Sequence, residues 1–389
     1  MMNRFLFTVG IGIACLTSTC FGMSIPENAN AVVSKHPIDT QLPVFKTISQ
    51  AIDNIPSTRS GTKKWTIFIT SDTYHERVVV PHNNLRLLGE NRDTTVVIYS
   101  RYAGQAVAPN SRETWGTRRT ATMELIGQNI SIEHLTVKNG FDYPGNEAKG
   151  ADDPTRVSGT QAVALKTDSQ SDRTFLNNVA LWSYQDTLYL KGDRTFIQGG
   201  IIAGNVDFIF GEGSALFDGV TLLSRERHLE NDGYWGYITA PSTNIHRPYG
   251  LTFVNCRLER EPGVPDNSVA LGRPWHPTTT FSDGRYADPA AVGKATYINT
   301  FMAGHIAKER WTSMNGKTPS GEKKAFSPHT EARFAEYGSY GEGAGNNALL
   351  LPAHPHQLSQ KTVAFYTSQA ILRGWLPEGA SPTRFAISQ

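Results

Sequence analysis

The chain has 389 residues, of which 39% are hydrophobic and 19% charged, and its formal net charge at pH 7 is +2. This ordinary composition argues against a disordered chain and against a multi-span membrane protein, and the length suits one repetitive domain or two conventional ones. Basic and acidic residues are interspersed, with no run of Lys or Arg of the kind that follows a nucleic-acid backbone, so we expect no nucleic-acid partner.

The N-terminal segment 1–22 has the order of regions that is typical of a secretory signal peptide. Arg4 precedes an uncharged segment that is apolar at first and then small and polar. Its apolar part is too short to span a bilayer. We therefore predict a signal peptide over 1–22, a mature domain over 23–389 and a secreted protein. A lipoprotein anchored at Cys15 or Cys20 is the alternative.

Removal of this leader leaves Cys256 as the single cysteine of the mature chain. An intramolecular disulfide is then impossible, so stability has to come from a large regular core. Cys256 lies in the apolar segment LTFVNCRL and is predicted to be a small buried core residue. The histidines are scattered and no His/Cys grouping has metal-ligand spacing, so we predict no metal site.

Helices are predicted near both ends of the mature chain. Apolar residues recur at helical spacing from Val44 to Ile55, just before Pro56, which indicates a short N-terminal capping helix over the first coil. Residues 361–373 are predicted to form a second helix near the far end.

Between these ends the chain consists of short β-rich segments separated by Gly, Asn and Asp. Polar positions in them recur at a nearly constant interval, from Asn177 to Gln198 and again from Gln198 to Asp218. An interval in the low twenties, holding two or three short strands, is typical of a parallel β-helix. We predict an all-β fold, a single-stranded right-handed parallel β-helix, with the polar stretches 101–120 and 140–160 as long loops on one face beside a binding groove.

The same interval brings several polar residues together. Asp186 and Asp207 are separated by one coil, and Gln161 precedes Gln185 by slightly more than one coil. Equivalent positions on neighbouring coils lie about 4.8 Å apart. The spacing therefore predicts a ladder of Gln161, then Gln185 and Asp186, then Asp207 on three successive coils.

Such a ladder suits acid and nucleophile chemistry. Two carboxylates this close cannot both ionise cheaply, so one is expected to keep its proton while the other is charged. Arg273 is the candidate partner for the charged member, and the amides of Gln161 and Gln185 can donate hydrogen bonds to an oxyanion. The alternative is a purely structural ladder, because an Asp in a turn commonly hydrogen-bonds its own backbone.

The segments that carry these residues resemble the signature blocks of the pectin methylesterase family of carbohydrate esterases. The resemblance covers roughly residues 43–376 and is closer to the bacterial-type branch than to the plant one. Its blocks are QAVAL (161–165), YQDTLY (184–189), GNVDFIFG (204–211), GYWGYITAPST (233–243), LGRPW (271–275), FSDGRYADP (281–289) and WTSM (311–314).

The resemblance implies a role for each residue of the ladder. Asp207 matches the nucleophile that attacks the C6 carbonyl of a galacturonate methyl ester, and Asp186 matches the acid/base that protonates methanol and then activates water. Gln161 and Gln185 match the oxyanion donors, and Arg273 matches the residue that holds the nucleophile. A carboxylate nucleophile is chemically reasonable because the resulting anhydride is readily hydrolysed.

The resemblance also implies a substrate and its contacts. The substrate is methylated homogalacturonan, bound by a monomer that needs no cofactor and no metal. The matching substrate-binding positions are Tyr189, Phe210, Thr239, Trp275 and Met314. One departure is Asp72, which replaces the Gly of the family's Gly-x-Tyr-x-Glu block at 72–76, where we expect a turn.

Three other classes of function remain open from the residues, and the first is glycan cleavage. A polygalacturonase would also use two carboxylates about 5 Å apart, and a pectate lyase would need a calcium-binding acidic cluster, for which Asp152–Asp153 is the candidate. A binding protein would keep the solenoid without the chemistry, although Asp186, Asp207 and Arg273 are all present. A related esterase acting on an ester other than pectin is the third.

Overall fold

The structure is a computed structural model that describes residues 24–57, 62–228, 233–344 and 356–385. The predicted signal peptide and its cleavage site lie outside these residues.

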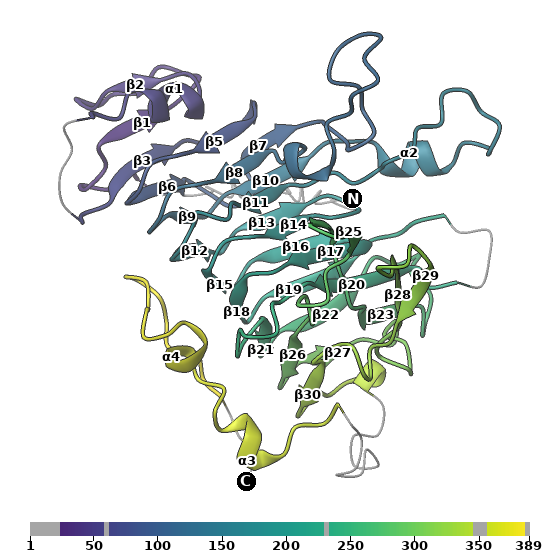
Figure 1. The fold of residues 1–389 in the computed structure, drawn as a ribbon. Helices are drawn as coiled ribbons and strands as arrows, with labels where there is room; N and C mark the ends of the chain where they lie inside the picture. Colours follow the sequence, from purple (N-terminus) through teal and green to yellow (C-terminus); the bar gives the residue numbers. More distant parts are fainter. Residues whose placement is uncertain (1–23, 58–61, 229–232, 345–355, 386–389) are drawn as a thin grey trace, which may run out of the picture.

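Within the described residues, three long parallel sheets run the length of the molecule (Figure 1). Sheet A has the spatial order β2 (Val44–Phe45), β1 (Ala31–Val33), β3 (Trp65–Ile69), β6 (Leu85–Gly89), β9 (Ser131–Glu133), β12 (Thr174–Asn177), β15 (Arg194–Gln198), β18 (Ser214–Asp218), β21 (Leu251–Val254), β26 (Ala295–Ile298) and β30 (Ala335–Tyr337). Sheet B has the order β27 (Phe301–Met302), β22 (Arg257–Arg260), β19 (Thr221–Ser224), β16 (Ile201–Gly204), β13 (Ala180–Trp182), β10 (Thr136–Asn139), β7 (Thr95–Tyr99) and β4 (Asp72–His75). Sheet C has the order β23 (Val269–Gly272), β20 (Gly236–Pro241), β17 (Val206–Gly211), β14 (Leu188–Leu190), β11 (Leu165–Thr167), β8 (Met123–Leu125) and β5 (Val78–Val80).

From β3 to β23 the chain visits the sheets in rotation, so that each of these coils gives one strand to each sheet. The predicted right-handed parallel β-helix is thus confirmed. The predicted repeat is confirmed as well, because Asn177 on β12 pairs with Gln198 on β15, and Gln198 pairs in turn with Asp218 on β18. Apolar side chains from all three sheets fill the interior. On sheet A, Phe217, Phe253 and Tyr297 form a stack whose successive ring centroids are 4.3 and 4.5 Å apart.

Cys256 is fully buried, as predicted. Burial raises the pKa of its thiol to about 12, so the side chain stays neutral and serves as a small core residue.

A column of left-handed residues turns the chain from sheet A to sheet B. Its members have φ between 49° and 64° and are His134, Asn178, Gly199, Gly219, Asn255, Asn299 and Gly338. Only Gly adopts this conformation freely, and Asn tolerates it better than most residues. The Gly and Asn that separate the β-rich segments in the sequence are therefore the corners of the coils.

The N-terminal helix α1 (Ile48–Asp53) covers the first coil as predicted, burying Ile48, Ala51 and Ile52. The preceding Val44–Phe45 are the strand β2 and not helix, because they extend sheet A beside β1. The Glu76 carboxylate accepts hydrogen bonds from the backbone amides of Ile48 and Ser49, at 2.8 and 2.9 Å. Glu76 thus satisfies backbone donors that have no partner within the first turn of the helix.

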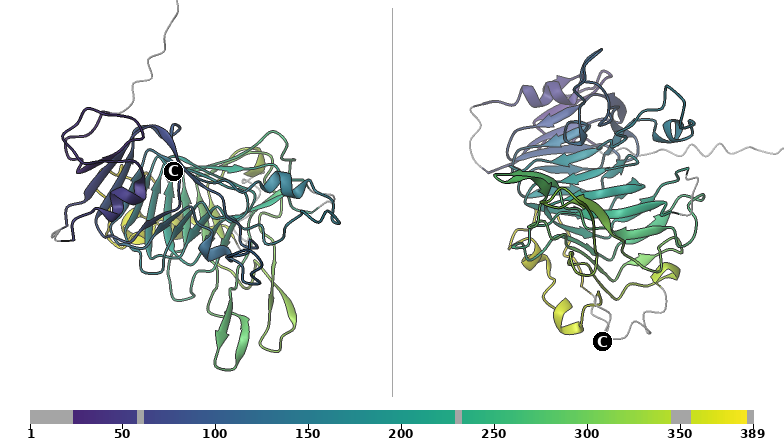
Figure 2. Two further views of the ribbon diagram at one scale, coloured as in Figure 1. Left: turned by 90° about the horizontal axis from the view of Figure 1, so that it is seen from above. Right: turned by 45° about the vertical axis from the view of Figure 1, so that its right-hand side comes forward.

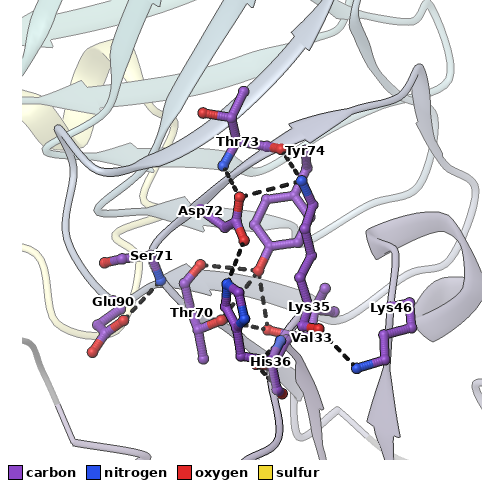
Figure 3. Close-up of polar contacts among 11 residues, drawn as sticks. Val33, Lys35, His36, Lys46, Thr70, Ser71, Asp72, Thr73, Tyr74 and Glu90 are labelled. Atoms are coloured by element: carbon purple, nitrogen blue, oxygen red, sulfur yellow. Dashed lines mark hydrogen bonds and ion pairs between the residues drawn. The ribbon is translucent and has the colours of Figure 1, made fainter.

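Asp72 lies at the start of strand β4 and not in a turn, so that expectation was wrong. Its carboxylate accepts from the backbone amide of Thr73 at 2.6 Å and pairs with Lys35 at 3.2 Å and His36 at 3.5 Å (Figure 3). Burial alone would raise the pKa of Asp72, but the Thr73 and Lys35 contacts outweigh it and lower the pKa. Asp72 therefore ties the segment after β1 to the edge of sheet B.

The C-terminal segment runs along the outer face of sheet A instead of capping the far end. It forms two short helices, α3 (Gln360–Val363) and α4 (Ser368–Ile371), in place of the predicted single helix over 361–373 (Figure 1). They cover a column of outward-facing apolar side chains, one from each coil: Phe175, Phe196, Leu216, Val254 and Ile298.

The predicted long loops lie on one side of the stack, where two antiparallel hairpins accompany them (Figures 1 and 2). The 101–120 loop ends in the 3₁₀ turn η1 (Thr117–Arg119), and the 140–160 loop contains α2 (Tyr143–Glu147). The hairpins are β24 (Thr278–Phe281) with β25 (Gly284–Ala287), and β28 (Met314–Lys317) with β29 (Lys323–Phe326). A further 3₁₀ turn is η2 (Glu342–Ala344). No helix in the described part of the chain has the length and apolar character needed to cross a membrane.

Candidate active site

A cleft of about 980 Å³ lies on the outer face of sheet C, between the 101–120 loop and the two hairpins. It brings together nearly all the residues predicted for the site. The predicted residues that line it are Gln161, Gln185, Asp186, Tyr189, Asp207, Phe210, Arg273, Trp275 and Met314.

Asp186 and Asp207 are neighbours across adjacent coils, as their spacing predicted. Leu188 on β14 pairs with Ile209 on β17, and the same register sets Asp186 level with Asp207. Both residues are left-handed, with φ of 66° and 50°. The register of β17 against β20 shifts between Val206 and Ile209, which marks a β-bulge at Asp207. Bulges commonly re-aim a side chain beside an active site, and this one carries Asp207 on the cleft wall.

Arg273 holds the Asp207 carboxylate through two parallel hydrogen bonds. Its Nε donates to Oδ1 at 2.8 Å and its Nη2 to Oδ2 at 2.7 Å. The guanidinium also lies 3.8 Å from the centre of the Tyr237 ring. A bidentate pair of this kind fixes the orientation of the carboxylate.

Asp186 lies in a very different environment. Burial raises its pKa well above the ordinary value, the negative charge of Asp207 raises it further, and Arg273 opposes both only in part. Asp186 therefore keeps its proton to a higher pH than an ordinary aspartate does. The two carboxyl groups of one site thus lie in unlike environments, an arrangement that suits an acid beside a nucleophile.

The two glutamines line the cleft beside the aspartates. The Gln185 side-chain carbonyl accepts from the Thr160 hydroxyl at 2.8 Å, which leaves its amide hydrogens for a ligand. Leu165 on β11 pairs with Leu188 on β14, and the same register sets Ala162 level with Gln185 and Gln161 one position away. The predicted ladder is therefore present, with a one-position stagger at its first member.

Aromatic side chains form the floor of the cleft. The rings of Tyr189 and Phe210 stack with centroids 4.3 Å apart, and the Trp275 ring meets both edge-on. Met314 reaches the cleft from hairpin strand β28. An apolar floor beside polar groups is the usual composition of a site that binds a sugar face.

Thr239 is not brought into the cleft. It is fully buried in β20 and donates to the Leu271 carbonyl at 2.8 Å. Side chains alternate along a strand, so its neighbour Ala240, which pairs with Phe210, faces the cleft instead.

Several cleft residues were not identified individually from the sequence. They come from the 101–120 loop, which was predicted only as a loop beside a groove, and from the β24–β25 hairpin, and they include Trp115, Thr117, Arg118, Thr278, Thr280 and Arg285. The sequence does not single out these residues because residues in irregular loops follow no repeat.

The acidic pair considered for calcium forms a local turn. Asp153 accepts from the backbone amide and the hydroxyl of Thr155, both at 2.7 Å. Among the residues that the structure describes, there is no group of three or more His, Cys, Asp or Glu side chains placed to hold a metal ion.

Comparison with known proteins gives consistent matches over most of the chain. The pectinesterase family model matches residues 30–374. Pectinesterase A of Dickeya dadantii is 43% identical over 350 residues, which cover 90% of this chain and 92% of the relative. Among solved structures, a pectin methylesterase in complex with a hexasaccharide is 42% identical with a TM-score of 0.83, and covers 90% of this chain and 98% of its own. The pectin methylesterase of Yersinia enterocolitica is 43% identical with a TM-score of 0.78, covering 85% and 99%.

Proposed function

The chain belongs to the pectinesterase family, and from this premise we propose the groups through which it hydrolyses the methyl esters of pectin. The observation that carries the assignment is the Asp207 carboxylate held by Arg273 beside Asp186, whose pKa is raised. Asp207 is the nucleophile, Asp186 the acid and base, and Gln161 and Gln185 the oxyanion donors.

In the first half of the reaction an Asp207 oxygen attacks the C6 carbonyl carbon of a methylated galacturonate. The carbonyl electron pair moves to the oxygen, where the amide hydrogens of Gln161 and Gln185 stabilise the negative charge. Each such donor contributes about 3–4 kcal/mol to the transition state. As the intermediate collapses, the C–O bond to the methoxy group breaks and Asp186 gives its proton to the departing methanol.

In the second half Asp186, now a carboxylate, removes a proton from water. The hydroxide attacks the same carbonyl carbon of the mixed anhydride, and the bond to Asp207 breaks. The products are a galacturonic acid group, which releases its proton to solvent, ionised Asp207 paired again with Arg273, and protonated Asp186. Atoms and charges balance without a cofactor, and no redox step occurs.

The substrate is methylated homogalacturonan, a polymer, and the shape of the cleft agrees with this. Tyr189, Phe210 and Trp275 provide a floor for sugar rings, and a related pectin methylesterase was solved with a hexasaccharide. We propose further that the protein acts as a monomer and is secreted after removal of residues 1–22, which form a leader of the signal-peptide type.

The experiment that tests the assignment is methanol release from highly methylated pectin by the wild type, Asp207→Ala and Asp207→Asn. We expect a loss of several orders of magnitude in both variants, with unchanged circular dichroism and no new reducing ends in any sample. Rapid methanol release by folded Asp207→Asn would overturn the nucleophile, and new reducing ends from the wild type would indicate glycan cleavage instead.

A further inference from the structure

The cleft contains basic side chains that the ester chemistry does not use. Its lining includes Arg118, Arg119 and Arg285 besides Arg273. Arg273 is paired with Asp207, and Arg119 is paired with Glu113 at 2.8 Å. Within the described ranges, no carboxylate lies at ion-pair distance from Arg118 or Arg285.

Of these two arginines, Arg118 lies where two spaces on the surface adjoin. It lines the main cleft and also an adjoining hollow of about 280 Å³. The two spaces share the aromatic residues Tyr189 and Trp275, so the hollow continues the floor of the cleft. The other cation of the hollow, Lys191, already pairs with Glu212 at 3.2 Å.

The local structure holds Arg118 at this junction. It lies in η1 (Thr117–Arg119), and the turn is anchored where Arg119 donates to the carbonyls of Thr114 and Trp115, at 2.6 and 2.7 Å. Burial raises the pKa of Tyr189, whereas the neighbouring Arg118 guanidinium acts to lower it. Arg118 thus lies beside Tyr189 in the lining of both spaces, with its side chain exposed to solvent.

An exposed guanidinium at the edge of the cleft favours an anionic group of a bound polymer over a neutral one. The methyl ester being hydrolysed is neutral, but every turnover leaves a carboxylate on the polymer. Arg binds a carboxylate through two parallel hydrogen bonds, which a methyl ester cannot match because it carries no charge. A galacturonate that was demethylated earlier and is bound beside the reacting sugar would present its carboxylate to the Arg118 guanidinium.

From this geometry we infer that Arg118 is a specificity-determining residue, which binds the free carboxylate of a galacturonate near the attacked ester. The enzyme then prefers pectin that already carries free carboxylates. Each demethylation therefore makes the polymer a better substrate for the next one. This inference rests on the proposed function, because it places the reacting ester at Asp207.

The test compares two substrates that share one polymer backbone and differ in degree of methylation: highly methylated pectin, and the same pectin partly demethylated with alkali. For Arg118→Gln we expect kcat/KM on the partly demethylated pectin to fall about tenfold, which corresponds to one lost charged contact. On the highly methylated pectin the change should stay within about twofold. Inhibition by polygalacturonate should weaken about tenfold, and Arg118→Lys should retain part of the preference because it keeps the charge.

Arg112→Gln is the matched control, since it removes the same charge from an exposed position of the same loop outside the cleft. Equal losses on both substrates, or no change on either, would overturn the inference. So would the same shift in Arg112→Gln, which would indicate general attraction by net charge. Failure of the wild type to release methanol from the highly methylated pectin would instead count against the proposed function, so the two outcomes are distinguishable.

Discussion

At the scale of single residues, the raised pKa of Asp186 leads to a pH dependence. Methanol can leave only while Asp186 holds its proton, and burial together with Asp207 raises the pKa of Asp186. As pH rises through that raised pKa, the acid is lost and kcat/KM should fall, giving an alkaline limb. In Asp186→Asn the rate should be lower by about 10²–10⁴ and this limb should be absent. Initial rates of methanol release across pH test this, and an unchanged alkaline limb in the variant would exclude Asp186 as the acid.

The raised pKa of Asp186 should also lower the stability of the folded protein at alkaline pH. Because the folded pKa of Asp186 is raised, the folded state binds this proton more tightly than the unfolded state does. Stability from this group is complete below the unfolded pKa, about 3.9, and is lost as pH rises through the folded pKa. Asp186→Asn removes the charge and keeps the shape, so its free energy of unfolding should exceed that of the wild type by a clearly larger margin at pH 8 than at pH 4. Urea unfolding at both pH values measures the difference, and equal gains at both would point to packing rather than ionisation.

The sequence was sufficient to predict those site residues whose placement follows the coil period. Asp186 and Asp207 are one coil apart, and the structure sets them level. Thr239 was assigned to the cleft by the resemblance alone, whereas alternation along β20 turns it inward and brings Ala240 to the cleft. Arg118 lies in a loop, where side-chain position depends on tertiary contacts that the sequence does not display.

At the scale of secondary-structure elements, the N-terminal cap depends on Glu76. Its carboxylate accepts from two backbone amides and the Ser49 hydroxyl at the start of α1. In Glu76→Ala these amides would lose a charged partner at the positive end of the helix, so we expect a loss of about 1–2 kcal/mol. His75→Ala, at the exposed neighbouring position, should stay within about 0.5 kcal/mol. Chemical denaturation of both variants tests the cap, and equal values would show that α1 does not need it.

The left-handed column between sheets A and B makes a second element-level prediction. Asn178 has φ of 49°, and its amide is 3.0 Å from the His134 ring. Asn178→Ala loses that contact and places a side chain with a Cβ in a conformation that costs about 1–2 kcal/mol, whereas Asn178→Gly loses the contact alone. We expect the Ala variant to have the lower melting temperature of the two by thermal unfolding. The reverse order would mean that the entropy of Gly in the unfolded chain outweighs the strain at this corner.

At the scale of the whole molecule, the coil architecture was predictable and the outer covering was not. The repeat is a property of the sequence itself, so the parallel stacking of the coils follows from it, while the sequence left two or three strands per coil open. The outward apolar residues Phe175, Phe196 and Leu216 recur with that same repeat and read from the sequence as further interior residues. Their partners in α3 and α4 are far along the chain, which is why a capping helix was expected in place of a cover on sheet A.

This covering segment should stabilise the solenoid as a whole. Leu372 is fully buried against the outer column of sheet A, whereas Phe365 in the same segment is 67% exposed. Leu372→Ala should lower the free energy of unfolding by about 2–5 kcal/mol, and Phe365→Ala should change it by less than about 0.5 kcal/mol. In a solenoid each coil contacts only its neighbours, so a segment that crosses several coils couples their stabilities. Loss of that contact should therefore broaden the urea transition of Leu372→Ala, while kcat below the transition stays at the wild-type value because the cleft lies on sheet C. Equal stability in the two variants would mean that the segment rests on sheet A without holding the coils together.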